Sequence, residues 1–308
     1  MKKRRVVIIG AGHVGSHVAS ALMLQDICEE IVLLDTDRKK AECHAEDIQD
    51  TACYAGKRTR IWAGGYEACE DADICVISYC GFIFKENRIE ELDEAIRIAG
   101  EVIPQLKASG FKGMIVSITN PCDLVALYFK MQSGFQVIGT GTSLDSARFR
   151  VRLGQQLSLP PSSIEAYCAG EHGNSQVPVW SQVRIGGRRL SELEKEMPER
   201  FGNIDKQKIE HATINAGWGI VTGKGSTEFG IGAAAAHIIR AVLTDSREVL
   251  PCSYEYRRNA DSPLIYTSIP SIIGAEGVIA RFRPEFTAGE AKRFEESCLL
   301  MEQYSTRY

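Results

Sequence analysis

Features that mark several common classes of protein are missing from this sequence. Its 308 residues contain no apolar run long enough to cross a membrane, no internal repeat and no low-complexity tract. The ten cysteines are scattered and none forms a Cys-x-x-Cys pair, so the close ligand pairs of a structural zinc site are lacking. We therefore expect reduced, mostly buried thiols, no metal, and a cytoplasmic protein.

The sequence also lacks a large excess of charge of either sign. Its 36 basic and 40 acidic residues give a net charge of -4, which argues against nucleic acid or an anionic membrane as the main partner. The basic residues 2–5 and the apolar residues 6–9 look like the start of a signal peptide. Gly10, Gly12 and Gly15 interrupt that apolar stretch, so we expect no export.

The first half of the chain has the pattern of an α/β fold. Short β-branched runs alternate with helical patterns through residues 1–142, which is typical of βαβ units in a parallel sheet. Apolar residues at helical spacing predict a helix over residues 88–105. The predicted strands are residues 5–9, 30–34, 60–63, 73–78, 114–118 and 136–138.

From residue 142 onward, longer helical patterns replace this alternation. We predict a Rossmann-type doubly wound parallel sheet followed by an α+β domain. Thr287 and Glu290 form a capping box that opens a final helix. The other predicted elements are a helix carrying Phe149, Leu153 and Leu157, a hairpin at residues 183–190 turning at Gly186-Gly187, and helical segments near residues 205–222 and 232–245.

A glycine-rich loop directly follows the first predicted strand. Gly10, Gly12 and Gly15 have G-x-G-x-x-G spacing, with His13 and Val14 between the second and third glycines, and we predict a helix from Val14 through Gln25. The spacing alone is a weak indicator, but the strand–loop–helix context is that of a dinucleotide site. A pyrophosphate would lie at the helix N-terminus, where N–H groups and the helix dipole favour an anion. We interpret His13 as a spacer with a solvated ring.

Asp35 ends the second predicted strand, twenty residues after Gly15. A carboxylate there accepts hydrogen bonds from the adenosine ribose and repels the 2′-phosphate of NADP, so we expect NAD as the cofactor. Arg38 lies close enough in the sequence to weaken this discrimination against NADP. The simpler alternative is that Asp35 only caps a turn.

The second half contains a histidine between glycines, in Gly170-Glu171-His172-Gly173. Such a histidine is positioned by the backbone and does not belong to an apolar core face. Asp145 and Arg148 lie three residues apart on a predicted helix, so they share a face. The simplest alternative for these two is a local surface ion pair.

Taken together, these residues resemble the lactate/malate dehydrogenase family over essentially the whole chain. Asn174-Ser175 and residues 223–227 are similar to the family's L-2-hydroxyisocaproate dehydrogenase branch. The motifs that carry the resemblance are the glycine loop with Asp35, Thr119-Asn120-Pro121, Leu144-Asp145-Ser146-Ala147-Arg148 and Gly170-Glu171-His172-Gly173.

The resemblance implies a role for each polar residue of these motifs. His172 would donate a proton to the substrate carbonyl oxygen, and Asp145 would orient its imidazole. Arg148 would bind the substrate carboxylate through two parallel hydrogen bonds. Arg88, from a mobile loop over residues 80–87, would polarise the ketone. Asn120 would hydrogen-bond the substrate oxygen beside the nicotinamide, and so belongs to both the substrate and the cofactor sites.

The loop before Arg88 departs from the family pattern. Lactate enzymes of the family carry glutamines there, and malate enzymes carry an arginine for the second carboxylate. This sequence has Phe82-Ile83-Phe84-Lys85 in a slightly shortened loop, with Ile83 near the discriminating position. An apolar lid would strand a second carboxylate, which disfavours malate unless Lys85 turns inward.

The segment Ala216-Gly217-Trp218 indicates the same preference. Its distance from Thr227 places it on the far side of the substrate pocket, where Gly217 leaves room. The alternative is that Gly217 and Gly219 only kink a helix. We therefore expect a roomy apolar pocket that suits larger 2-oxo acids.

The sequence thus predicts an NAD-dependent L-2-hydroxyacid dehydrogenase that favours bulky apolar 2-oxo acids. Its domains would be an NAD-binding Rossmann domain (1–142) and a substrate-binding catalytic domain (143–308). The alternatives are an ordinary L-lactate dehydrogenase, a malate dehydrogenase and a non-catalytic NAD-binding redox sensor. The sensor is disfavoured because His172, Asp145, Arg148 and Arg88 are all present. The resemblance implies a homodimer or homotetramer.

Asp35 should make the enzyme prefer NADH to NADPH, because its carboxylate repels a 2′-phosphate. The measurement is kcat/KM for each cofactor at a fixed, saturating concentration of 2-oxo acid. We expect a clearly higher value with NADH. Equal values would mean that Arg38, and not Asp35, governs the adenosine site.

Overall fold

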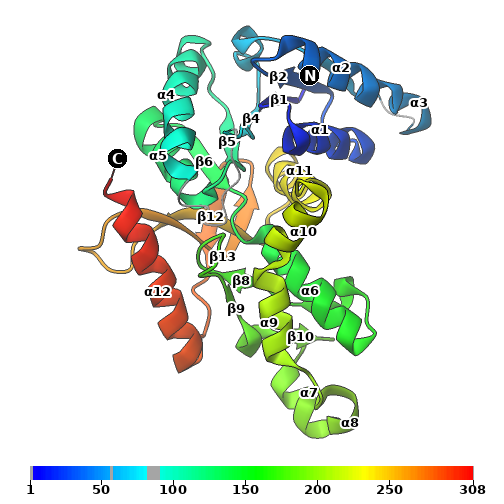
Figure 1. The fold of residues 1–308 in the computed structure, drawn as a ribbon, viewed down its shortest axis with the longest axis vertical. Coiled ribbons are helices and arrows are strands. Elements are labelled where there is room, and N and C mark those ends of the chain that lie inside the picture. Colours follow the sequence, from blue (N-terminus) through cyan, green and yellow to red (C-terminus); the bar gives the residue numbers. More distant parts are fainter. Residues whose placement is uncertain (1–2, 56–57, 82–90, 308) are drawn as a thin grey trace.

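A mixed nine-stranded sheet forms the centre of the computed structural model, which describes residues 3–55, 58–81 and 91–307 (Figure 1). The strand order is β14-β13-β12-β6-β5-β4-β1-β2-β3, in which β1 to β6 are parallel and β12 to β14 antiparallel. The strands are β1 (Arg5–Ile9), β2 (Glu30–Leu34), β3 (Arg60–Ala63), β4 (Ile74–Ile77), β5 (Met114–Ser117), β6 (Gln136–Gly139), β12 (Glu248–Tyr256), β13 (Ile265–Gly274) and β14 (Gly277–Arg281).

Helices cover both faces of the parallel strands, because these strands are apolar on both sides. Along β1, Val6 and Ile8 pack with α1 and α11, whereas Val7 and Ile9 pack with α4 and α5. Strands buried on both faces are typical of parallel sheets. The doubly wound architecture is therefore confirmed. The helices of this part are α1 (His13–Gln25), α2 (Arg38–Asp50), α3 (Ala52–Ala55), α4 (Leu92–Ala108), α5 (Cys122–Ser133) and α11 (Phe229–Leu243).

The six strands predicted in the first half are all present. Three have the predicted bounds, β5 and β6 differ by one residue at one end, and β4 is one residue shorter at each end. The helix predicted over residues 88–105 corresponds to α4, which continues three residues further, to Ala108. Residues 88–90 of that prediction lie outside the described residues. Short apolar runs predicted these strands correctly because each strand contributes side chains to the apolar layers on both faces of the sheet.

The second half packs shorter elements around α6 (Ser143–Leu157). The predicted hairpin is present, and Gly186 and Gly187 have φ of 57° and 78°, as a two-residue turn with positive φ at both positions requires. The remaining elements are β7 (Ile164–Glu165), β8 (Cys168–Ala169), β9 (Val177–Pro178), β10 (Arg184–Ile185), β11 (Arg188–Arg189), α7 (Leu190–Glu196), α8 (Pro198–Phe201), α9 (Lys206–Ile214), α10 (Ala216–Lys224) and α12 (Ala288–Ser305).

The region predicted to be helical near residues 205–222 is helical in the structure, but it is divided into two helices. Two helices, α9 and α10, meet at Asn215, which ends one and begins the other. The Asn215 side chain donates a hydrogen bond from Nδ2 to the His211 carbonyl at 2.9 Å. An asparagine amide that bonds the preceding turn favours a helix end over a helix interior. The break therefore falls at Asn215 and not at Gly217 or Gly219.

The antiparallel extension of the sheet was not predicted. Both long strands contain a proline, which normally argues against a central strand. In the structure Pro251 of β12 lies directly opposite Pro270 of β13, so the two residues without an N–H share one position of the ladder. The two prolines therefore obscured the strand pattern, because each is tolerated only where it lies opposite the other.

Small residues join the two halves of the chain. Gly139 at the end of β6 pairs with Ser253 of β12, and a Cβ on Gly139 would lie 2.9 Å from the Ser253 Cβ. Ser268 of β13 accepts the Gly170 N–H and donates its own N–H to the Gly170 carbonyl, both at 2.9 Å. Its hydroxyl accepts the Thr142 N–H at 3.0 Å. The start of α6 and the loop after β8 are thus anchored to one strand.

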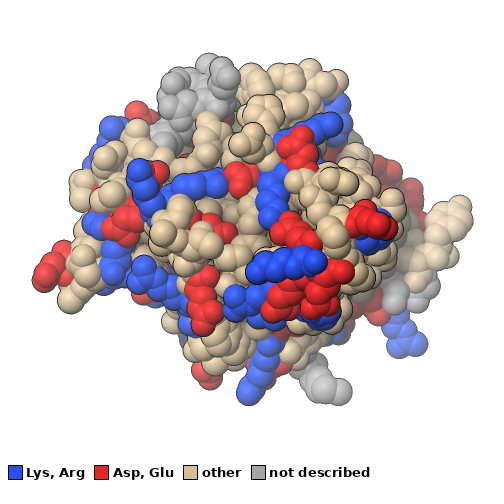
Figure 2. Space-filling model, turned by 90° about the horizontal axis from the view of Figure 1, so that it is seen from below, with Lys and Arg blue, Asp and Glu red and all other residues tan. Residues whose placement is uncertain are grey.

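The surface and the cysteines agree with the composition. Basic and acidic side chains are interspersed on the face in Figure 2, which is the underside of the view in Figure 1. No helix in the described ranges is long and apolar enough to span a membrane. Seven of the ten cysteines are buried, as expected.

Thr287→Ala should destabilise the fold modestly, because Thr287 caps α12. Its hydroxyl oxygen accepts the Glu290 N–H at 3.3 Å, and Glu290 accepts the Thr287 N–H at 2.8 Å. Loss of such a cap costs about 1 kcal/mol of unfolding free energy, or about 2 °C in Tm for a chain of this size. Thermal unfolding of Thr306→Ala, at the other end of α12, is the control, and equal losses in both variants would contradict the cap.

Candidate active site

The three glycines of the loop between β1 and α1 lie in different surroundings. Gly10 has φ of 101°, and a Cβ there would lie 2.5 Å from the Tyr79 nitrogen. A Cβ on Gly15 would lie 1.9 Å from the Gly10 carbonyl oxygen, so α1 could not pack against the loop. A Cβ on Gly12 would meet only the Lys40 ammonium, at 3.8 Å. The first and third glycines thus serve packing, and the second faces open space.

Asp35 lies beside this loop at the end of β2. Its Oδ2 accepts the Ala11 N–H at 2.7 Å and its Oδ1 accepts the Asp37 N–H at 2.9 Å. Arg38, which could soften the discrimination against NADP, donates a hydrogen bond to Glu42 at 3.1 Å. The carboxylate of Asp35 is therefore the charged group that bonds directly to the glycine loop.

The first residues of α1 connect the loop to the second half of the chain. The His13 side chain is 76% exposed, as a spacer would be, but its Nδ1 lies 3.3 Å from a carboxylate oxygen of Glu228. Val14 packs against the apolar layer formed with α1 and α11. The ring of Phe229 meets the His17 ring edge to face, with centroids 4.6 Å apart. The α10–α11 turn thus touches the predicted cofactor loop.

The structure brings together three of the predicted polar residues. Asp145, in the first turn of α6, accepts a hydrogen bond from Arg148 Nη1 at 3.1 Å, and its other oxygen lies 2.6 Å from Nδ1 of His172. Asp145 is 1% exposed and Arg148 is 9% exposed, so this is a buried pair and not a surface ion pair. A buried carboxylate that bonds two cation-forming groups is well compensated.

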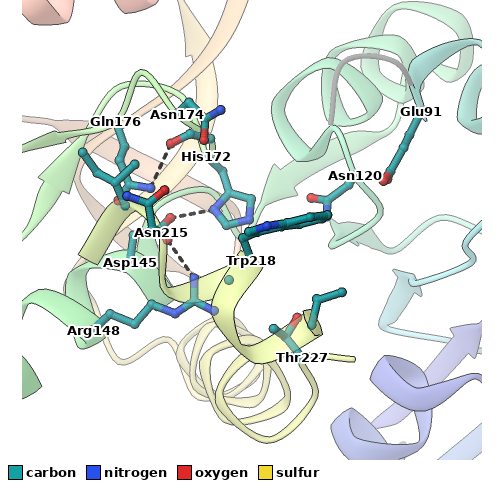
Figure 3. Close-up of a pocket in the computed structure, with 14 residues that line it drawn as sticks. Glu91, Asn120, Asp145, Arg148, His172, Asn174, Gln176, Asn215, Trp218 and Thr227 are labelled. Carbon is teal, nitrogen blue, oxygen red and sulfur yellow. Dashed lines mark hydrogen bonds and ion pairs between the residues drawn. The ribbon is translucent and has the colours of Figure 1, made fainter. Parts of the chain in front are cut away.

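These residues line a pocket that also contains the predicted wall. In Figure 3, Asp145 and Arg148 lie on one side of His172, and Asn120 and Trp218 lie on the other. The pocket is lined by Glu91, Asn120, Asp145, Arg148, His172, Gly173, Asn174, Gln176, Ile214, Asn215, Gly217, Trp218, Val221 and Thr227.

The pocket includes polar residues that the sequence analysis missed. The amides of Asn174, Gln176 and Asn215 line it, together with the carboxylate-bearing Glu91. Proximity to His172 in the sequence could have indicated the first two. Asn215 had no such signal, because it lies inside the region predicted to be helical near residues 205–222. The described wall is therefore more polar than the apolar pocket that we expected.

Two predicted residues cannot be placed. Ile83 and Arg88 lie outside the described residues, together with the rest of the apolar sequence around Ile83. Gly217 and Thr227, two of the residues expected to bind substrate, line the described wall. Glu228, next to Thr227, bonds Lys224 and the Ser226 hydroxyl, which holds the turn that carries Thr227.

The comparisons with known proteins cover both halves of the chain. Residues 4–138 match the family model for the lactate/malate dehydrogenase, NAD binding domain, and residues 142–302 match that for the lactate/malate dehydrogenase, alpha/beta C-terminal domain. The chain belongs to the lactate/malate dehydrogenase family. It is an NAD-dependent dehydrogenase, and NAD is its cofactor.

Individual relatives are similar over their whole length. The chain is 36% identical over 307 residues to an L-lactate dehydrogenase of Fusobacterium nucleatum subsp. nucleatum. The alignment covers 99% of this chain and 96% of that protein. It is 36% identical over 306 residues to L-lactate dehydrogenase 3 of Bacillus cereus, with 98% and 96% covered. The crystal structure of a minor L-lactate dehydrogenase from Enterococcus mundtii has a TM-score of 0.93 at 31% identity, with 100% and 99% covered.

The residues present fit a bound dinucleotide. Within the described part of the chain no side chain caps the N-terminus of α1, which leaves its first N–H groups for an anion. Gly12 faces open space there. At the other end of the site, Oδ1 of Asn120 is buried and has no hydrogen-bond partner among the residues that the structure describes. A buried orphan acceptor is costly unless a ligand satisfies it.

Proposed function

We propose that this chain is an L-2-hydroxyacid dehydrogenase that reversibly reduces a small 2-oxo acid. The observation that carries the proposal is the chain of contacts from Arg148 through Asp145 to His172, in a pocket shared with Asn120. Arg148 is a cation that can bind a carboxylate, and His172 is a proton donor for a carbonyl oxygen. The two groups serve the two functional groups of a 2-oxo acid.

The cofactor site is proposed to be the β1–α1 loop. Gly10, Gly12 and Gly15 would let the pyrophosphate approach the N-terminus of α1, where His13 and Val14 are the first residues. Asp35 would accept the ribose hydroxyls. Asn120 would orient the nicotinamide end. Bound NADH supplies the hydride that reduces C2.

The chain's own residues handle the proton and the substrate charge. Because Nδ1 of His172 is hydrogen-bonded to Asp145, Nε2 is the nitrogen that exchanges a proton with the substrate oxygen. The Asp145 carboxylate stabilises the imidazolium and fixes the ring. Arg148 binds the substrate carboxylate through its planar guanidinium. Arg88 stays a prediction as the group that polarises the ketone.

A preference for bulky apolar 2-oxo acids is our proposal for the substrate. Ile214, Gly217 and Val221 give the described wall an apolar part, and Gly217 adds no side chain. Phe82, Ile83 and Phe84 would supply the apolar lid. Arg148 and His172 are the basic residues that line the described pocket, so a second carboxylate has no cation of its own there. This disfavours malate, unless Lys85 turns inward.

An ordinary L-lactate dehydrogenase is the second candidate. The amides of Asn174, Gln176 and Asn215 make the described wall less apolar than a large side chain requires. The named relatives, at 36% identity, are L-lactate dehydrogenases. A homodimer or homotetramer and a cytoplasmic location stay predictions.

His172→Asn should abolish turnover and leave cofactor binding intact, because general acid catalysis contributes about 10²–10⁴-fold. The measurements are kcat with NADH and pyruvate, and the Kd of NADH by fluorescence titration. His211→Asn, an exposed histidine of α9, is the matched control and should retain full activity. A His172→Asn variant with more than about a tenth of the wild-type kcat would remove His172 from this role.

Substrate choice is tested by kcat/KM for pyruvate, 2-oxoisocaproate, phenylpyruvate and oxaloacetate. Three extra buried carbons at about 0.8 kcal/mol each give 2-oxoisocaproate an advantage over pyruvate of up to several tens of fold. Oxaloacetate should be worst, and Ile83→Arg should improve it by supplying a cation. If pyruvate exceeds both larger acids, the second candidate replaces the first.

A further inference from the structure

A second buried carboxyl group holds His172, and it belongs to the other half of the chain. Oδ2 of Asp123 accepts the main-chain N–H of His172 at 2.7 Å, across 49 residues of sequence. Asp123 is 2% exposed. Asp145 thus binds the ring of His172, and Asp123 binds its backbone.

Asp123 lies in the first turn of α5, three residues after Asn120. One short segment at the carboxyl end of β5 therefore carries the pocket residue Asn120 and the anchor of His172. The neighbouring main chain is also held, because the Glu171 N–H donates to the Ser297 hydroxyl of α12 at 2.9 Å. Glu171 itself bonds the Ser175 N–H at 3.2 Å and the Ser175 hydroxyl. The contact from Asp123 ties His172 to the segment of Asn120.

We propose that Asp123 is a positioning residue that sets His172 relative to Asn120, and that its negative charge supports the protonated form of His172. The proposal rests on the proposed function of His172. The hydrogen bond fixes the His172 backbone, and the negative charge of Asp123 acts electrostatically on the His172 ring, which gains and loses a proton. Asp123 is absent from the motifs that implied the other roles.

The surroundings of Asp123 disfavour its ionised form. Burial is the largest effect and raises the pKa of Asp123 to about 6, although the Ser253 hydroxyl and the His172 N–H and ring favour the carboxylate. The negative charge of Glu171 raises the pKa of Asp123 further. A carboxyl group with a raised pKa stabilises the fold less as the pH rises through 6. Keeping a carboxylate there at neutral pH therefore opposes stability.

The test uses Asp123→Asn, which retains an oxygen that can accept the His172 N–H but removes the charge. We expect its Tm at pH 7.5 to equal or exceed that of the wild type. The alkaline limb of the pH profile of kcat/KM for pyruvate should move to lower pH by about one unit, which is about tenfold in kcat/KM at pH 8. The Kd of NADH should not change.

Asp123→Ser, with a shorter side chain, removes the charge and weakens the backbone contact, and it should also lower kcat. Asp261→Asn, an exposed aspartate, is the control for loss of one negative charge. A wild-type pH profile in Asp123→Asn together with a wild-type kcat in Asp123→Ser would overturn the proposal. If the wild type reduces no 2-oxo acid with NADH, the proposed function fails instead, so the two failures are distinguishable.

Discussion

The pocket depends on the close backbone approach between β6, β12 and β13. Gly139 and Ser253 are small enough to let the antiparallel strands join the parallel sheet. Ser268 then holds both the Gly170 backbone and the Thr142 N–H. A larger side chain at this join would move α6 against the loop of His172. Residues from distant parts of the sequence meet because this join leaves no freedom between them.

Charge compensation is the second constraint on the site. Asp145 and Asp123 are buried carboxyl groups that bond the ring and the backbone N–H of one histidine, and Arg148 bonds Asp145. Buried charges are tolerated when each has a partner, and removal of one partner leaves the other uncompensated. The same arrangement gives a 2-oxo acid a cationic place for its carboxylate and a proton for its carbonyl oxygen. The contacts among Arg148, Asp145 and His172 thus serve both stability and the proposed chemistry, whereas the charge of Asp123 opposes stability.

Some of this site could be read from local sequence because the chemistry follows backbone rules. The glycine loop was recognisable since Gly10 and Gly15 cannot carry a side chain there, and Asp35 follows at a fixed strand length. His172 between glycines and Asp145 three residues before Arg148 also gave local signals. Asp123 and Asn215 gave none, because each acts through a residue far away in the chain or through a helix break that periodicity does not register.

By itself, the sequence determined the parallel strands, the dinucleotide loop and the family, because alternating apolar layers and glycine spacing are properties of neighbouring residues. Only the tertiary structure decided the burial of the Asp145–Arg148 pair, the polar character of the described wall and the pairing of Pro251 with Pro270. It also decided that His172 is held from two sides, by α6 and by α5. Those features depend on contacts between distant segments, and such contacts leave no periodic pattern in the chain.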